Sequence, residues 1–203
     1  MQLLDIVAPH PDDATDAACA LIEAASGTGR VTLVGIDGRC GAGKTALAER
    51  VAHRLGATIV DVYDFYRPMR HDRRVALPPE EAAALLIDWR RLQAELLEPL
   101  RSGVAARYRR YDWQRCVVDG TPVPVGPEGV VIVEGVGATR RELERLLDVR
   151  IVVQTPLEVC LERVAVKRAP RVRALTEAWA AAEDWFFEHD DPASRADLIV
   201  SGL

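Results

Sequence analysis

The residues with the clearest chemical potential form the octapeptide GRCGAGKT at 38–45. It matches the pattern G-x-x-x-x-G-K-[ST], in which glycines let backbone N–H groups approach and bind phosphate oxygens. Lys44, one of two lysines in the chain, would neutralise the β- and γ-phosphates, and Thr45 would ligate Mg²⁺. We therefore predict that the loop binds a nucleoside triphosphate together with Mg²⁺. The predicted cofactor-binding residues are Gly38, Arg39, Cys40, Gly41, Ala42, Gly43, Lys44, Thr45 and Ala46.

A carboxylate that could join the metal site ends the apolar stretch VVIVEG, where Glu134 precedes a glycine. In an open α/β sheet, ligands bind beyond the carboxyl ends of the strands. Glu134 is therefore predicted, with Thr45, to hold or orient Mg²⁺. The alternative is an ordinary carboxylate at a strand end.

The stretch VDVYDFYRP at 60–68 supplies candidates for the base that would accept a proton from an acceptor hydroxyl. On an extended strand Asp61 and Tyr63 share one face, while Asp64 points to the other unless the chain has begun to turn. We predict Asp64 as the catalytic base, with Asp61 as the second candidate. Tyr66 and Arg67 are predicted to contact the acceptor.

Cations that could cover the γ-phosphate lie in CLERVAVKRAPRVR at 160–173. Arg163 and Lys167 stand one helical turn apart, and further arginines flank Pro170. The segment is predicted to be a lid; the alternative is a solvated basic helix end, which is also a favourable place for positive charge. Lys44 and Arg163 are predicted catalytic residues, and the predicted cofactor-binding residues of the lid are Lys167, Arg168 and Arg171.

Two arginine-rich runs, RPMRHDRR at 67–74 and RYRRYDWQR at 107–115, have two interpretations. They could line a pocket for an anionic acceptor such as a sugar phosphate or a carboxylate, or they could be solvated loop faces. Within the second run, Tyr111 and Asp112 are predicted to contact the acceptor.

The elements that must position these residues alternate between apolar strands and amphipathic helices. Strands are expected at 30–38, 57–62, 129–135, 149–155 and 196–202, with helices between them. This alternation predicts an α/β fold, a three-layer α/β/α P-loop NTPase with a mainly parallel five-stranded sheet. It would carry a helical lid and an irregular or hairpin excursion near 103–128. We expect one domain over 1–203, with an N-terminal helical extension at 1–29 and the lid at 160–173.

Composition narrows the function classes. The net charge of −5 argues against nucleic-acid and membrane-surface partners, and no apolar run is long enough for a membrane span. The four cysteines are widely spaced, which suits reduced thiols, and the N-terminus lacks the features of a signal peptide. A cytoplasmic protein with a small-molecule acceptor is expected. The oligomeric state is open, a homo-oligomer included.

The chain contains no asparagine, so the N-K-x-D guanine motif of regulatory GTPases is absent. Motor and transporter ATPases are normally larger and carry further motifs. A phosphate-binding loop in a chain of 203 residues therefore favours a small-molecule kinase.

An ordered set of motifs resembles the uridine kinase and phosphoribulokinase-like group of P-loop kinases. The set comprises VGIDGRCGAGKTALAERVA, DFYRP, DWRRLQAELLEPLRSG, YDW, IVEG, LERVAVKR and ADLIVSG, over about residues 30–200. The resemblance implies a phosphotransferase that uses ATP and Mg²⁺ to phosphorylate an alcohol group of a small metabolite. In uridine kinases this group is the nucleoside 5′-hydroxyl.

The resemblance has departures. The family pattern D-x-F-Y places its acid where this chain has Tyr63, so the chemistry would rest on Asp64 or Asp61 or be lost. The lid has Lys167-Arg168 in place of an R-D pair often seen in uridine kinases. Two alternatives therefore stay open: a kinase for an anionic sugar or carboxylate acceptor, and a nucleotide-binding regulator with altered catalysis.

Overall fold

A computed structural model describes residues 5–6, 11–167 and 173–202 of the chain. The described residues form a central parallel sheet of six strands, in the order β1-β10-β9-β2-β8-β3. Its strands are β1 (Asp5–Ile6), β10 (Leu198–Ser201), β9 (Val149–Gln154), β2 (Thr32–Asp37), β8 (Val130–Glu134) and β3 (Thr58–Asp61). The α/β P-loop fold class and the five predicted strands are confirmed. The sixth strand, β1, has only two residues, too few to give a sequence pattern.

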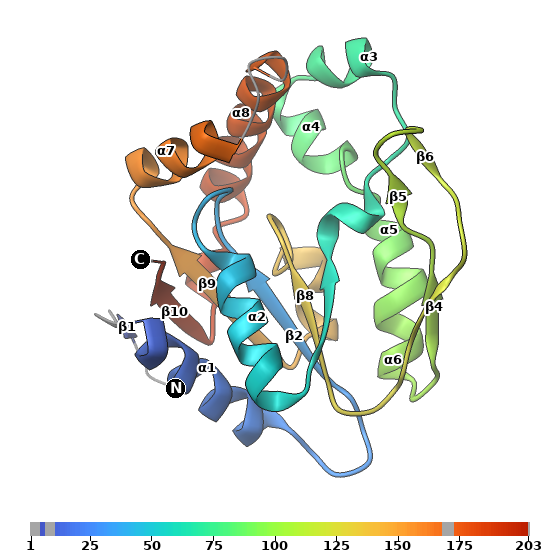
Figure 1. Cartoon of the computed structure of the whole chain (residues 1–203), viewed down its shortest axis with the longest axis vertical. Helices are drawn as coiled ribbons and strands as arrows, with labels where there is room; N and C mark the ends of the chain where they lie inside the picture. The colour runs from blue at the N-terminus through green and yellow to red at the C-terminus, as the bar shows by residue number, and fades with distance from the viewer. Residues whose placement is uncertain (1–4, 7–10, 168–172, 203) are drawn as a thin grey trace.

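Helices cover both faces of this sheet (Figure 1), as the three-layer prediction requires. On one face α1 (Pro11–Ala25) and α2 (Lys44–Leu55) pack together. Strand residues alternate between the faces: Val34 of β2 packs on the side of α1 and α2, and Leu33 packs on the opposite side. Both are fully buried, which explains why these strands are continuously apolar. The predicted N-terminal extension thus contributes α1 to the core and β1 to the sheet.

The opposite face carries a helical run that starts at Asp88, whose carboxylate accepts a hydrogen bond from the backbone N–H of Arg91 at 3.2 Å. Asp88 is therefore the N-cap of this run. The run consists of α5 (Trp89–Leu92), a π-helical segment η2 (Gln93–Leu97) and α6 (Glu98–Arg101). Pro99 has no N–H to donate back along the helix. The π-helical hydrogen-bond pattern of η2 lies directly before this proline.

The excursion predicted near 103–128 is a pair of antiparallel hairpin ladders. In the first, β4 (Ala106–Tyr108) pairs with β7 (Val123–Val125); in the second, β5 (Tyr111–Asp112) pairs with β6 (Val117–Val118). The carboxylate of Asp112 accepts hydrogen bonds from the backbone N–H groups of Gln114 and Arg115 and so shapes the turn.

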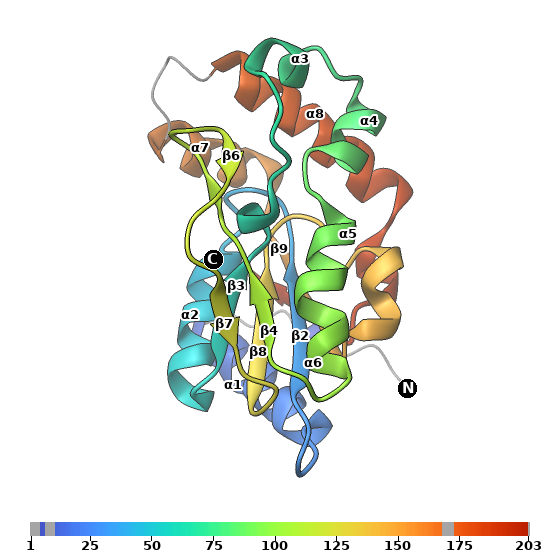
Figure 2. The same cartoon turned by 90° about the vertical axis from the view of Figure 1, so that its right-hand side faces the viewer.

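The remaining elements lie above the carboxyl ends of the strands or beside the sheet. Figure 2 shows α8 running alongside α3 and α4. Apart from α8, which extends to His189, these elements are short. They are η1 (Val62–Phe65), α3 (His71–Val75), α4 (Pro79–Leu85), η3 (Arg141–Leu146), α7 (Leu157–Lys167), α8 (Arg173–His189) and η5 (Pro192–Arg195). Between the strands predicted at 129–135 and 149–155, the expected helix is the 3₁₀ helix η3.

Among the described helices, none is both long enough and apolar enough to cross a membrane. The cytoplasmic location stays a prediction.

Candidate active site

The phosphate-binding loop joins β2 to α2 at the carboxyl edge of the sheet. Gly38, Gly41 and Gly43 have φ angles of 143°, 86° and 106°, in the region that favours glycine. A Cβ on Gly38 would lie 2.4 Å from the carbonyl oxygen of Val153, and one on Gly41 would lie 2.5 Å from that of Cys160. The glycines therefore allow both the loop's curvature and its close packing. Every residue of the predicted cofactor-binding run 38–46 lies in this loop or the first turn of α2.

Lys44 begins α2 and is buried, with 7% of its surface exposed. Its Nζ donates a hydrogen bond to the carbonyl oxygen of Arg39 at 2.9 Å, so the ammonium folds back over the loop. The N-terminus of α2 lies at the same place and adds a partial positive charge. Cation, helix end and loop N–H groups thus converge on one small volume that suits a phosphate chain.

The two predicted metal ligands touch each other. The hydroxyl of Thr45 donates to Oε1 of Glu134 at 2.9 Å, and Glu134 is 6% exposed at the end of β8. Hydroxyl and carboxylate oxygens are hard donors that suit Mg²⁺. Within the described residues there is no group of three or more His, Cys, Asp or Glu side chains that could hold a metal ion. A bound Mg²⁺ would therefore complete its shell with phosphate oxygens and water, as is usual in kinases.

Asp61 ends β3 directly beside Glu134, its partner in the parallel register. One of its carboxylate oxygens accepts a hydrogen bond from the backbone N–H of Tyr63 at 2.8 Å and caps η1. Burial raises the pKa of Asp61 to about 6; the neighbouring carboxylates of Glu134 and Asp64 add to the rise, while the Tyr63 N–H and Lys44 oppose it. Asp61 is thus a partly buried acid at the metal and phosphate edge of the sheet.

Asp64 has a different environment, because η1 turns the chain immediately after Asp61. Its Oδ2 accepts a hydrogen bond from the hydroxyl of Tyr108 at 2.9 Å. The same oxygen forms an ion pair with Nε of Arg110 at 3.1 Å. Burial next to Asp64 raises the pKa of Tyr108 to about 12, so that hydroxyl stays protonated and donates. The structure therefore ties the Asp64 carboxylate to the hairpin strand β4 and the residues after it.

The predicted lid residues fall partly outside the described chain. Arg163 on α7 donates hydrogen bonds to the carbonyl oxygens of Gly41 and Gly202, at 3.2 and 2.9 Å. It therefore links α7 to the phosphate-binding loop. Lys167 is the last residue of α7, while Arg168 and Arg171 lie outside the described residues. The lid and its cations stay predictions.

Helix α8 also reaches the phosphate-binding loop, which sequence reasoning did not anticipate. Oε2 of Glu183 accepts a hydrogen bond from the backbone N–H of Cys40 at 3.0 Å. Arg39 pairs with Asp184, and its guanidinium lies 5.0 Å from the centre of the Phe187 ring. Two carboxylates of α8 thus lie against a loop built to receive an anion.

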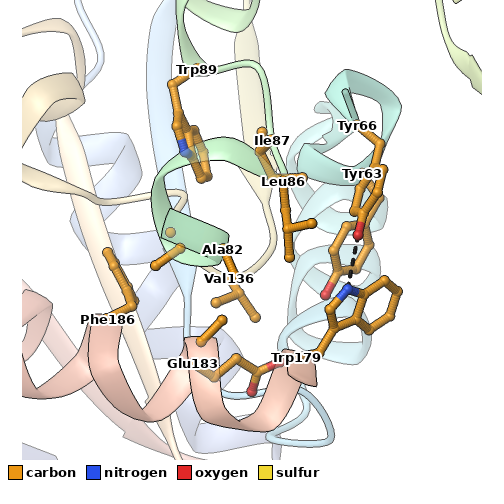
Figure 3. A pocket seen from close by; sticks show the side chains of 13 residues that line it. Tyr63, Tyr66, Ala82, Leu86, Ile87, Trp89, Val136, Trp179, Glu183 and Phe186 are labelled. Atoms are coloured by element: carbon orange, nitrogen blue, oxygen red, sulfur yellow. Dashed lines mark hydrogen bonds between the residues drawn. The ribbon is translucent and has the colours of Figure 1, made fainter. Parts of the chain in front are cut away.

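Beside these acids lies a pocket with a volume of about 50 Å³, shown in Figure 3. Its wall comes from four separate parts of the chain: η1, the segment from α4 to Trp89, the two residues that follow Glu134-Gly135, and α8. Aromatic and aliphatic side chains dominate it. The lining residues are Tyr63, Tyr66, Ala82, Ala83, Leu86, Ile87, Trp89, Val136, Gly137, Trp179, Ala182, Glu183 and Phe186.

Of the four residues predicted to contact an acceptor, Tyr66 lines this pocket. Its hydroxyl accepts a hydrogen bond from Nε1 of Trp179 at 2.8 Å. Tyr111 packs behind it, with ring centres 5.3 Å apart. Arg67 pairs with Asp88 at 3.5 Å, and Asp112 caps the hairpin turn, so neither lines the pocket.

The arginine-rich runs are engaged with the protein itself. Arg74 is buried, donates to the Tyr111 hydroxyl at 3.0 Å and covers the Tyr66 ring at 4.6 Å. Further arginines make ion pairs with carboxylates near them in space: Arg70 with Asp72, Arg110 with Asp64, and Arg115 with Asp119. These contacts favour a structural role for the arginines that make them.

Sequence reasoning also missed Asp37, the last residue of β2. Its fully buried carboxylate accepts hydrogen bonds from the backbone N–H groups of Gly38, Gly137 and Thr139 and from the Thr139 hydroxyl, at 2.7–2.9 Å. Burial raises the pKa of Asp37, and these donors oppose the rise. Asp37 thus fastens the phosphate-binding loop to the wall of the pocket. A charged residue at the end of an otherwise apolar strand was the available signal.

Comparison with known proteins agrees with this geometry. Residues 33–202 match the model of the phosphoribulokinase / uridine kinase family. A uridine kinase of Halobacterium salinarum is 29% identical over 182 residues, covering 82% of this chain and 78% of that protein. A uridine kinase of Limosilactobacillus reuteri is 26% identical, covering 84% and 83%. A solved structure described as a possible uridine kinase from Bacillus stearothermophilus has a TM-score of 0.70 at 20% identity, covering 93% of this chain and 98% of that one.

Proposed function

Because the chain belongs to the phosphoribulokinase / uridine kinase family, we propose that it transfers the γ-phosphoryl group of ATP to a hydroxyl of a small molecule. The contact between Thr45 and Glu134, beside Asp61 and directly beyond the phosphate-binding loop, carries this proposal. It brings a metal-ligand pair, an acid and an anion-binding loop to one edge of the sheet. Such a combination is what phosphoryl transfer requires.

On the donor side, the N–H groups of the loop and the N-terminus of α2 would bind the phosphates of ATP. Lys44 would leave the Arg39 carbonyl oxygen, or share it, to neutralise the phosphate charge. Mg²⁺, held at Thr45 and Glu134, would supply further neutralisation of the transferring group. Arg163 would fix α7 against the loop through the Gly41 carbonyl.

On the acceptor side, we propose Asp61 as the general base, ahead of Asp64. The oxygen of the acceptor hydroxyl forms a bond to the γ-phosphorus as the bond to the β–γ bridging oxygen breaks. The hydroxyl proton passes to Asp61, and the products are ADP and a phosphate monoester. A carboxylate with a pKa of about 6 is deprotonated at neutral pH yet is a better proton acceptor than an ordinary aspartate.

The relatives named uridine kinase make a nucleoside hydroxyl the first acceptor class to test. An anionic acceptor is less well supported, because Arg67, Arg74 and Arg110 are each bound to groups of the protein. The regulator alternative rests on Tyr63, which occupies the family's acidic position. Asp61, a nearby acid at the end of β3, supports retained catalysis instead.

The direct test is acceptor-dependent ADP formation by the purified chain with ATP and Mg²⁺, with the phosphorylated product identified by mass spectrometry. We expect turnover that stops when EDTA removes Mg²⁺ and returns when Mg²⁺ is restored. ATP binding without phosphoryl transfer to nucleosides, sugars, simple alcohols or carboxylic acids would instead support a regulator.

A further inference from the structure

We infer that the acceptor is an uncharged alcohol whose body is an apolar ring, bound in the pocket between η1, α4 and α8. This inference rests on the proposed function and narrows its acceptor class. It departs from the nucleoside acceptor suggested by the relatives' names. The chemistry of the pocket wall, its size and its position next to Asp61 support it.

The wall offers rings and aliphatic groups rather than polar partners. Tyr63 and Trp179 stack at 5.9 Å with an angle of 10° between their planes, and Trp89 and Phe186 lie across the pocket from them (Figure 3). Aromatic groups in such offset arrangements stabilise one another beyond simple burial. A flat apolar ring is therefore a suitable occupant.

Two polar groups at the wall have partners within the protein, whereas the buried indole Nε1 of Trp89 has no hydrogen-bond partner among the described residues. The Tyr66 hydroxyl accepts from the Trp179 indole N–H at 2.8 Å. The Glu183 carboxylate accepts from the Cys40 N–H at 3.0 Å. A nucleobase or a sugar carries several polar groups, and apart from the Trp89 N–H it would have to break these bonds or lose its own hydrogen bonds to water, which is unfavourable in a buried site.

The charges around the pocket argue against an ionic acceptor of either sign. The guanidinium of Arg74 covers Tyr66 at 4.6 Å, and that of Arg140 covers Trp89 at 4.4 Å. Ring faces that already meet a cation attract a second one less well, since the two cations repel each other. An anion would meet the carboxylate of Glu183, which is part of the lining.

The size of the pocket favours a small acceptor. Its volume of about 50 Å³ is less than the roughly 150 Å³ of a cavity that binds benzene. A single ring needs about three times this volume, so its entry requires the pocket to widen, for example by a movement of the Trp179 side chain. A nucleoside, with two rings and several hydroxyls, would need a much larger opening.

The position of the pocket lets a bound ring present a hydroxyl to the reacting groups. Tyr63 is two residues from Asp61, and Val136 is two residues from Glu134. On the opposite wall, Glu183 touches the phosphate-binding loop. A hydroxymethyl group at this side of the ring would then be directed toward the segments that carry Asp61, Glu134 and the phosphate-binding loop.

The first test compares kcat/KM for four acceptors with ATP and Mg²⁺: benzyl alcohol, uridine, glycerate and choline. We expect benzyl alcohol to exceed each of the others by at least about tenfold, a ratio that apolar contacts can supply. Preferential turnover of uridine, glycerate or choline would overturn the inference and leave the proposed function standing. ADP formation with none of them would count against the proposed function.

The second test does not depend on turnover. Isothermal titration calorimetry should detect benzyl alcohol binding to the chain loaded with a non-hydrolysable ATP analogue, and Trp179→Ala should weaken it about tenfold or more. Trp185→Ala is the matched control, because Trp185 is on the same helix but stacks on His189. Equal effects of the two substitutions, or no binding to the unaltered chain, would overturn the inference.

Discussion

The proposed donor site and the proposed acceptor pocket are built in opposite ways. The donor site is one continuous octapeptide, and its chemistry lies mainly in backbone N–H groups, one lysine and one hydroxyl. The acceptor pocket takes its wall from four segments between Tyr63 and Phe186, and its chemistry lies in apolar side chains. The first is fastened to the second by the buried carboxylate of Asp37.

Because of this difference, similarity to known proteins says more about the phosphate-binding half than about the acceptor pocket. A phosphate chain is the same in every ATP, so the backbone cradle that binds it has little freedom to vary. An acceptor pocket can change its specificity through a few side chains on unrelated segments while the fold stays the same. At 29% identity, family membership therefore supports a kinase more firmly than it supports uridine as the acceptor.

The largest expected effect on the use of ATP separates the two halves. Lys44→Ala should lower kcat/KM for ATP by about a hundred- to a thousandfold, because the phosphate charge loses its buried cation. Acceptor binding, measured by calorimetry, should change less than about twofold. Arg54→Ala is the control, since it removes an exposed cation from the same helix. Loss of acceptor binding in Lys44→Ala would mean that the halves are not separable.

A second substitution disturbs mainly the acceptor side. Gly137→Ala places a Cβ 2.7 Å from the Trp89 ring at a φ of +84°. We expect about 1–3 kcal/mol lower stability in chemical unfolding and a higher KM for the acceptor than for ATP. Gly129→Ala is closely matched, because its φ is +72° but nothing lies within 4 Å. If both substitutions lower the free energy of unfolding equally, strain in the backbone rather than contact with the Trp89 ring explains the result.

The pH dependence of kcat/KM tests the role of Asp61, which lies between the phosphate-binding half and the acceptor half. Its raised pKa of about 6 means that the carboxylate becomes protonated as the pH falls through 6 and can no longer accept a proton. kcat/KM for the acceptor should then fall about tenfold for each pH unit below that value. A profile that stays flat down to about pH 4.5 would exclude a base with this pKa.

The smallest expected effect concerns the contact of α8 with the phosphate-binding loop. Glu183→Gln keeps an acceptor for the Cys40 N–H but removes a negative charge beside the phosphates. ATP-analogue binding should tighten about two- to fivefold, a modest electrostatic gain. Glu188→Gln, at an exposed position of the same helix, should have no effect. Weaker binding in Glu183→Gln would indicate that the carboxylate organises the loop instead.

The sequence was informative where short-range patterns decide the structure. Apolar runs predicted five strands, and motif spacing predicted the glycines of the loop. The rule that strand ends meet at one edge of a parallel sheet placed Thr45 and Glu134 together. The hairpin excursion was also foreseen in outline.

The sequence was less informative where the structure depends on a turn or on a distant segment of the chain. Counting along a strand could not reveal that η1 begins at Val62 and turns Asp64 toward Tyr108 and Arg110. Nor does any local pattern indicate that Trp179 faces Tyr66, 113 residues away in the chain. The arginine runs could be interpreted as a pocket lining or as solvated loop faces, and packing against rings and carboxylates accounts for many of these arginines.

The central claim is that Asp61, rather than Asp64, is the base of a working kinase. The most direct measurement is kcat for Asp61→Asn and Asp64→Asn with the best acceptor, alongside thermal stability and ATP affinity to establish that both variants fold. We predict that Asp61→Asn loses about a hundred- to ten-thousandfold, and that Asp64→Asn loses less than about tenfold. The reverse order, or equal activity in all three proteins, would contradict the account.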